Sequence, residues 1–169
     1  MIEKLNFTCP GFFEGGEFPL DNTGRGADQS PEFFLQNLSP QAHSLAILLE
    51  DLDHPIKKSF THWLIWNIPA SSHIPANLSA GYDVAELKGA HQGIAYGWHV
   101  YAGPKPPLGQ THRYRFTVYA LDTTFDLGTW TRKSQLIKAM KGHVLQEGQL
   151  IASFGSNKLW NSEPETMMI

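Results

Sequence analysis

The stretch that indicates the fold most clearly is SLAILLEDLDHP, residues 44–55. Its first part, Ser44 to Glu50, is almost continuously aliphatic, which is typical of a strand that is covered on both faces. The run then ends at two carboxylates, Asp51 and Asp53, and at Pro55, where a strand usually gives way to a loop. Polar groups in such a position can converge on a small pocket while the aliphatic side chains beside them form its walls. The stretch therefore predicts a β scaffold that carries a polar pocket at one end.

Short apolar runs separated by turn residues continue along the chain, which contains 15 glycines and 11 prolines. We expect strands at 5–8, 32–35, 44–50, 61–68, 113–121 and 147–154, and one helix at 133–141 that is capped by Thr131 and ended by Gly142. Residues 113–121 alternate between apolar and polar side chains, apart from Tyr119, so one face of this strand should pack on a core. Residues 15–30 are polar and glycine-rich, which predicts a surface loop. The fold class that follows is mainly β, an antiparallel sandwich of two sheets with one or two short helices.

Composition limits the class of protein. The 169 residues fit a single domain, residues 1–169, with a polar tail from about residue 155. The net charge is −3 and the lysines and arginines are scattered, so a nucleic-acid partner is not expected. A single cysteine, Cys9, rules out an intramolecular disulfide, and no apolar run is long enough to span a membrane. We therefore expect a cytoplasmic protein.

Two histidines, His62 and His112, also stand near the ends of apolar runs, and we expect them to meet Asp51 and Asp53. Two ionised aspartates would repel an anion, at about 4 kcal/mol for a carboxylate ~4 Å from a phosphate at an effective dielectric of ~20. The aspartates are therefore expected to orient and charge the histidines, so that cationic His62 or His112 meets the anion. Gly103 would let backbone N–H groups approach it closely.

Other interpretations of the same residues stay open. Each histidine could be a packed side chain, and Asp-x-Asp before proline is common in turns. Asp51, Asp53, His62 and His112 could also bind a zinc ion that activates water for hydrolysis. A serine hydrolase is disfavoured because Ser153 lacks the Gly-x-Ser-x-Gly context.

Four blocks in order resemble the phosphatidylethanolamine-binding protein family, in its bacterial and archaeal Raf-kinase-inhibitor-like branch. They are 44–55, the His-Trp strand at 62–69, the glycine-proline loop and His-Arg-Tyr strand at 101–122, and Lys-Gly-His-Val-Leu at 141–145. The resemblance implies a two-sheet sandwich with a small pocket for phosphate or phosphoryl-headgroup anions. Carried over by motif, the residues that line or support this pocket are Asp51, Asp53, His62, Gly103, Pro104, His112 and Tyr114. It further implies a regulatory binding protein without a cofactor or enzymatic turnover, a homodimer, and a protein partner such as a kinase.

The chain also departs from the pattern of that branch. Leu52 stands where the branch usually has proline, and His54 stands where it has a small residue, so His54 either adds a titrating group to the pocket or faces water. Val100 and Ala102 stand where glycine is frequent, which predicts a tighter or shifted rim. If a histidine charge drives binding, affinity for phosphate should fall as pH rises through the histidine range.

Overall fold

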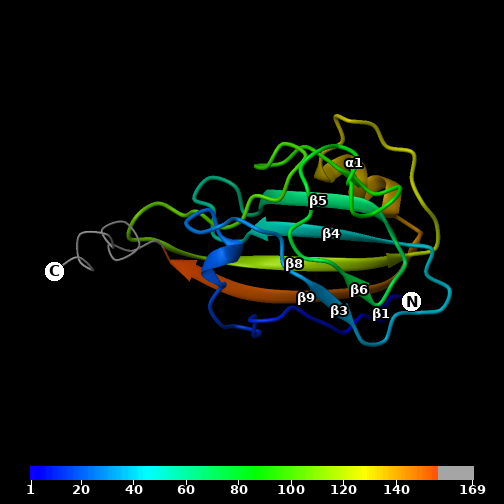
Figure 1. The fold of residues 1–169 in the computed structure, drawn as a ribbon, viewed down its shortest axis with the longest axis horizontal. Coiled ribbons are helices and arrows are strands. Elements are labelled where there is room, and N and C mark those ends of the chain that lie inside the picture. The colour runs from blue at the N-terminus through cyan, green and yellow to red at the C-terminus, as the bar shows by residue number, and fades with distance from the viewer. Residues whose placement is uncertain (156–169) are drawn as a thin grey trace.

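The computed structural model describes residues 1–155. Its strands form two sheets (Figure 1), a six-stranded sheet in the order β1-β9-β8-β4-β5-β7 and a three-stranded sheet in the order β2-β3-β6. The elements are β1 (Glu3–Lys4), β2 (Phe7–Thr8), η1 (Leu20–Asn22), β3 (Phe33–Leu35), β4 (Ser44–Asp51), β5 (Phe60–Pro69), β6 (His73–Ile74), β7 (His91–Gln92), β8 (Thr111–Leu121), α1 (Lys133–Met140) and β9 (Val144–Gly155). The predicted mainly β sandwich of two sheets is confirmed.

The central strand β4 explains why its sequence is aliphatic throughout. All eight of its residues are buried. It pairs antiparallel with β5 on one side and with β8 on the other, where Leu49 lies opposite Trp63 and Phe116 respectively. Alternate side chains enter two separate cores, Leu45, Ile47 and Leu49 between the sheets and Ala46 and Leu48 on the far side. A strand that packs against apolar side chains on both faces does not need the alternation of apolar and polar residues.

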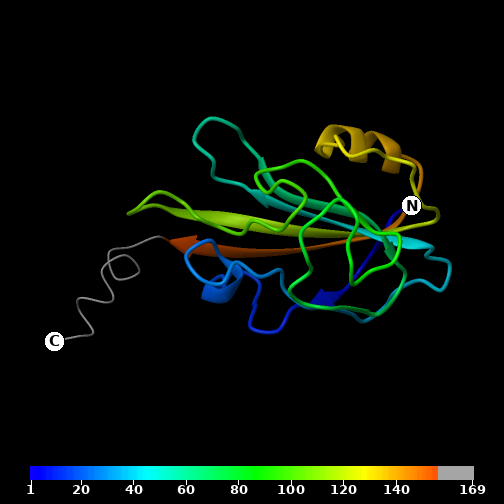
Figure 2. The same cartoon turned by 45° about the horizontal axis from the view of Figure 1, so that its top comes forward.

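The second core lies beneath α1, which covers the outer face of the large sheet (Figure 2). Leu136 and Met140 are the buried residues of this helix. Tyr119 packs at the edge of the same core, so its break in the alternation of β8 reflects the helix above it. The residue that caps the start of the helix is Arg132 and not the predicted Thr131. The Gln135 side chain accepts a hydrogen bond from the Arg132 backbone N–H, whereas the Thr131 hydroxyl donates to the Gly128 carbonyl.

Some boundaries differ from the prediction. The first strand was predicted at 5–8, but the structure has two short strands there, β1 and β2, which Leu5 and Asn6 separate, and β1 pairs parallel with β9. β9 begins three residues earlier than expected, at Val144. Residues 15–30 are more than a surface loop, because Phe18, Thr23 and Ser30 are buried. Residues 156–169, most of the predicted tail, lie outside the described part, and Gly155 is the last residue of β9.

The arrangement of three neighbouring strands positions the site. β4 ends at Asp51, which lies opposite Phe60 of β5 and Tyr114 of β8. The end of β4, the start of β5 and the start of β8 therefore meet at one edge of the large sheet. Within residues 1–155, no helix has both the length and the apolar character needed to cross a membrane.

Candidate functional site

A cavity of about 210 Å³ opens at this edge of the sheet. Its walls come from the three strand ends, the loop between β4 and β5, the loop at 94–98 and the proline-rich loop before β8. The lining residues are Asp51, His54, Pro55, Phe60, His62, Tyr96, Lys105, Pro106, Pro107, His112 and Tyr114. The cavity is therefore aromatic and proline-rich, with a few polar groups directed into it.

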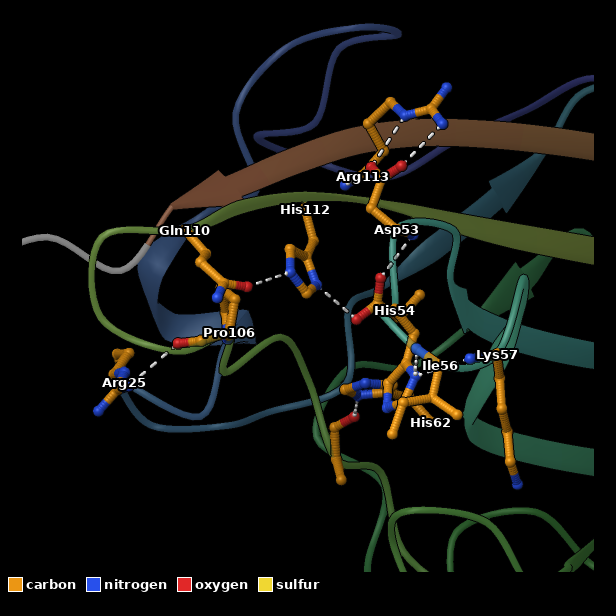
Figure 3. Close-up of polar contacts among 12 residues, drawn as sticks. Arg25, Asp53, His54, Ile56, Lys57, His62, Pro106, Gln110, His112 and Arg113 are labelled. Atoms are coloured by element: carbon orange, nitrogen blue, oxygen red, sulfur yellow. Dashed lines mark hydrogen bonds and ion pairs between the residues drawn. The ribbon is translucent and has the colours of Figure 1, made fainter.

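The innermost polar pair is Asp51 and His112, whose side chains are only 5% and 7% exposed. The His112 Nδ1–H donates to Asp51 Oδ2 over 2.7 Å, and the other carboxylate oxygen accepts the Asp53 backbone N–H at 2.9 Å. On the far side of the ring, His112 Nε2 lies 3.0 Å from Gln110 Oε1 (Figure 3). Both ring nitrogens thus face oxygen atoms, so each is positioned to donate a hydrogen bond when it carries a proton. Asp51 therefore contacts and orients His112, one of the two histidines that the sequence analysis expected beside it.

His62 behaves differently from His112. Its Nδ1–H donates to the Ala102 carbonyl at 2.9 Å. Burial lowers the pKa of His62, and this effect outweighs the opposing hydrogen bond to Ala102 and the charges of Asp51 and Asp28. The ring is therefore neutral near pH 7 and its Nε2 carries a lone pair, so His62 accepts hydrogen bonds. Which histidine meets an anion stays a prediction, although the lowered pKa of His62 disfavours this residue as the cation.

Three further groups can donate hydrogen bonds at the cavity. Burial raises the pKa of Tyr114, so its phenol stays protonated and can donate a hydrogen bond at the cavity. Lys105 is an exposed cation at the wall. His54 accepts the backbone N–H groups of Ile56 and Lys57 at its Nδ1, so its remaining proton is on Nε2. His54, which departs from the family pattern, is thus part of the wall and stacks on Phe60 at 4.8 Å between ring centroids.

Three of the predicted site residues lie behind the wall and do not line the cavity: Asp53, Gly103 and Pro104. Asp53 accepts hydrogen bonds from the Arg113 guanidinium and backbone, and the guanidinium contact above all lowers the pKa of this carboxyl. The Gly103 N–H donates to Asp28 Oδ1 at 2.7 Å, and a Cβ at position 103 would lie 2.1 Å from the Asn22 carbonyl oxygen. Glycine is therefore required here by the close approach of another loop and not by a ligand.

Sequence reasoning missed several wall residues. Tyr96 and Lys105 lie in loops without hydrophobic periodicity, so no pattern marked them. Asp28, which holds Gly103, belongs to the stretch predicted as a surface loop, and burial raises its pKa. Val100 and Ala102 do not line the cavity, although the Ala102 carbonyl fixes the tautomer of His62. Only one feature of the sequence could have pointed to further wall residues: Lys105, Pro106 and Pro107 directly follow the Gly103-Pro104 motif.

The metal hypothesis has a direct geometric test. In the described part of the chain, no three His, Cys, Asp or Glu side chains lie close enough together to hold a metal ion. Asp53 is engaged by Arg113 and Asp51 by His112, so the four proposed ligands do not share a centre. No observation therefore favours the metal-assisted hydrolase.

Comparison with known proteins agrees with this fold. A family model of phosphatidylethanolamine-binding protein matches residues 8–155. The UPF0098 protein PH1269 of Pyrococcus horikoshii is 38% identical over 155 residues, which make up 90% of this chain and 78% of that protein. The crystal structure of the PEBP homolog CT736 from Chlamydia trachomatis covers 91% of this chain and 99% of its own, with 26% identity and a TM-score of 0.79. Escherichia coli YbcL shares the fold, with a TM-score of 0.80 and 22% identity over 90% of this chain and 98% of that one.

A two-sheet sandwich with a small, mainly apolar cavity at one edge is typical of a ligand-binding β protein. The chain belongs to the phosphatidylethanolamine-binding protein family.

Proposed function

We propose that this protein binds a small phosphate or phosphoryl anion in the cavity lined by His112, Tyr114 and Lys105, as a binding protein and not as an enzyme. The observation that carries the proposal is the 3.0 Å contact between His112 Nε2 and the Gln110 side-chain oxygen. This oxygen marks a position at which a ring nitrogen of His112 contacts a hydrogen-bond acceptor. A phosphoryl oxygen could replace it, because Gln110 belongs to an exposed loop and its amide can swing into water.

The charges around the cavity are compatible with an anion even though Asp51 lines it. Both Asp51 oxygens already accept hydrogen bonds within the protein, one from the His112 ring and one from the Asp53 backbone N–H. Lys105 contributes a positive charge at the wall, and it interacts electrostatically with the Asp28 carboxylate. Neutral His62 would accept a hydrogen bond from a protonated phosphate oxygen or from the ammonium or hydroxyl of a headgroup.

Isothermal titration calorimetry with inorganic phosphate tests this function. We expect His112→Gln to weaken binding about tenfold to 100-fold, since a hydrogen bond to a charged group is worth roughly 1.5–3 kcal/mol. Lys105→Gln, at an exposed position, should weaken it without affecting folding, whereas Lys138→Gln on α1 should not change it. Sulfate, whose charge is constant across the histidine range, reports whether protonation of the protein itself controls affinity.

Two results would contradict the proposal. One is the absence of saturable phosphate binding to the wild-type protein. The other is unchanged affinity in both His112→Gln and Lys105→Gln while thermal melts show that both variants are folded.

The same proposal includes a cytoplasmic location and a regulatory role, which cell fractionation and partner capture test. A homodimer and a partner such as a kinase stay predictions from the family resemblance, and sedimentation equilibrium checks the dimer.

A further inference from the structure

A single imidazole holds the loop between β4 and β5 in place. This loop lines the cavity through His54 and Pro55. The His54 Nδ1 accepts the Ile56 backbone N–H at 3.3 Å and the Lys57 backbone N–H at 3.1 Å (Figure 3). In the described part of the chain, no other hydrogen bond fixes the backbone of residues 55–58. The position of this wall therefore depends on the lone pair of one nitrogen.

The protonation state of His54 decides whether that lone pair exists. A ring nitrogen that accepts N–H groups carries no proton, so the ring in this arrangement is neutral, with its proton on Nε2. Its face packs on Phe60, with 4.8 Å between ring centroids and 28° between the planes. Pro55 restricts His54 to extended conformations, which keeps the ring aligned with the loop. A second proton would turn Nδ1 into a donor that faces two other donors.

The surroundings of His54 offer the protonated ring no ion pair that would keep it in place. The charged and titratable groups around it are Lys57, Lys58 and the Arg113-bound Asp53 of its own loop, Asp51 at the end of β4, His62 of β5, Tyr96 in the loop at 94–98, Lys105 in the loop before β8, and His112 and Tyr114 of β8. Asp51 is already paired with His112. Within residues 1–155, no ion pair joins His54 to a carboxylate. Protonation therefore removes the contacts that hold the loop and supplies none in return.

We propose that His54 is a positioning residue that latches the β4–β5 wall of the cavity and releases it on protonation. The neutral ring holds the Ile56 and Lys57 N–H groups, whereas the protonated ring repels them and the loop opens the cavity to water. Water screens the charges that would hold an anion, so affinity falls. This effect opposes the gain expected from protonation of His112, and it limits anion binding on the acid side. The inference rests on the proposed function in one respect, since the wall belongs to the proposed anion cavity.

The latch is specific to the side chain at position 54. A small residue, which the family pattern has at this position, carries no acceptor that reaches two N–H groups. Asparagine does carry one, because its side-chain oxygen accepts the backbone N–H two residues on in an Asx-turn. His54→Asn therefore keeps an acceptor that does not titrate, and it separates the latch from its control by protons.

Nuclear magnetic resonance of the isotope-labelled protein tests the latch without any ligand. At about pH 8 the imidazole spectrum should place the His54 proton on Nε2. As pH falls to about 5, the amide signals of Ile56 and Lys57 should shift along the titration curve of the His54 ring. The shifts should disappear in His54→Asn. Amide signals that stay constant while the ring titrates, or a ring that keeps a single proton throughout, would overturn the proposal.

His73 provides the matched control. Its ring stacks on Phe34 with 4.9 Å between centroids and the same angle of 28°, and it does not line the cavity. His73→Asn thus removes an equally stacked imidazole and should leave the titration of the Ile56 and Lys57 amides unchanged. Loss of this titration in both variants would contradict the latch.

Calorimetry with sulfate measures the effect on binding, because the charge of sulfate is constant across the histidine range. Between about pH 7.5 and about pH 5.5, the affinity of wild type relative to His54→Asn should fall about fivefold, the factor that corresponds to one hydrogen bond of about 1 kcal/mol. A relative affinity that rises instead would mean that the protonated ring stays at the wall as a cation, and it would refute the latch.

The two experiments separate the latch from the proposed function. If neither sulfate nor phosphate binds while the amides follow the His54 ring, the proposed function fails and the latch stands. If anions bind and His112→Gln weakens them while the amides do not follow the ring, the latch fails and the proposed function stands.

Discussion

Replacing Asp51 with alanine should destabilise the protein strongly, because this carboxylate satisfies two buried donors. The substitution leaves the His112 Nδ1–H and the Asp53 backbone N–H without their acceptors. An unsatisfied buried donor costs about 1–3 kcal/mol, more if charged, and removal of one partner from a buried ion pair typically costs about 3–5 kcal/mol. We therefore expect the free energy of unfolding to fall by about 4 kcal/mol, which lowers Tm by roughly 8–16 °C in a chain of this size.

Asparagine at position 51 is the informative control. Its amide oxygen can still accept the Asp53 N–H, and its NH₂ group can donate to His112 Nδ1 if the histidine becomes neutral and keeps its proton on Nε2, facing Gln110. Asp51→Asn should therefore cost only about 1–2 kcal/mol. Urea unfolding of both variants measures the difference, and a loss below about 1 kcal/mol in Asp51→Ala would refute the reasoning.

Three further predictions follow from the contacts around the site. Gln92→Leu should lower the free energy of unfolding by about 3–5 kcal/mol in urea titrations. The fully buried Gln92 amide accepts a hydrogen bond from the Trp63 indole N–H and donates toward three backbone carbonyls, and leucine can make none of these bonds. A variant as stable as wild type would mean that water replaces the lost hydrogen bonds. Burial lowers the pKa of His62 in the folded state, so the unfolded chain takes up the proton first and stability should decline as pH falls below about 6.5. Thermal melts should show a flatter acid-side profile in His62→Gln than in wild type, and identical profiles would assign the decline to other groups. Gly103→Ala should lower Tm and weaken phosphate binding, because the new Cβ meets the Asn22 backbone oxygen at 2.1 Å; an unchanged melt would show that this loop yields easily.

The strands could be predicted wherever the pattern of apolar residues along the sequence matches the faces that the fold buries. The aliphatic run of β4 and the alternation of β8 follow directly from which faces are covered. Tyr119 did not fit the alternation because its burial depends on α1, a helix that follows later in the chain. Residues 15–30 look like a loop because glycine is frequent there, yet Phe18 packs against the rings of Phe12 and Phe116 in the core.

The site was predictable in its central residues and not in its electrostatics. His112 lies next to Asp51 through strand register across 61 residues, and family motifs mark both positions. The neutral state of His62 depends on burial and on the Ala102 carbonyl, which no spacing along the chain reveals. Tyr96 reaches the cavity through loop geometry alone.

The position of β9 in the large sheet affects how the nascent chain matures on the ribosome. β9 is the last described strand to be synthesised, yet it lies between β8 and β1 and pairs with β8 over nearly its whole length. Until it emerges, the long edge of β8 exposes backbone hydrogen-bonding groups, and β1, made first, has no strand to join. Truncated or stalled translation products should therefore be prone to edge-to-edge aggregation and dependent on chaperones, even though they already carry Asp51, His62 and His112.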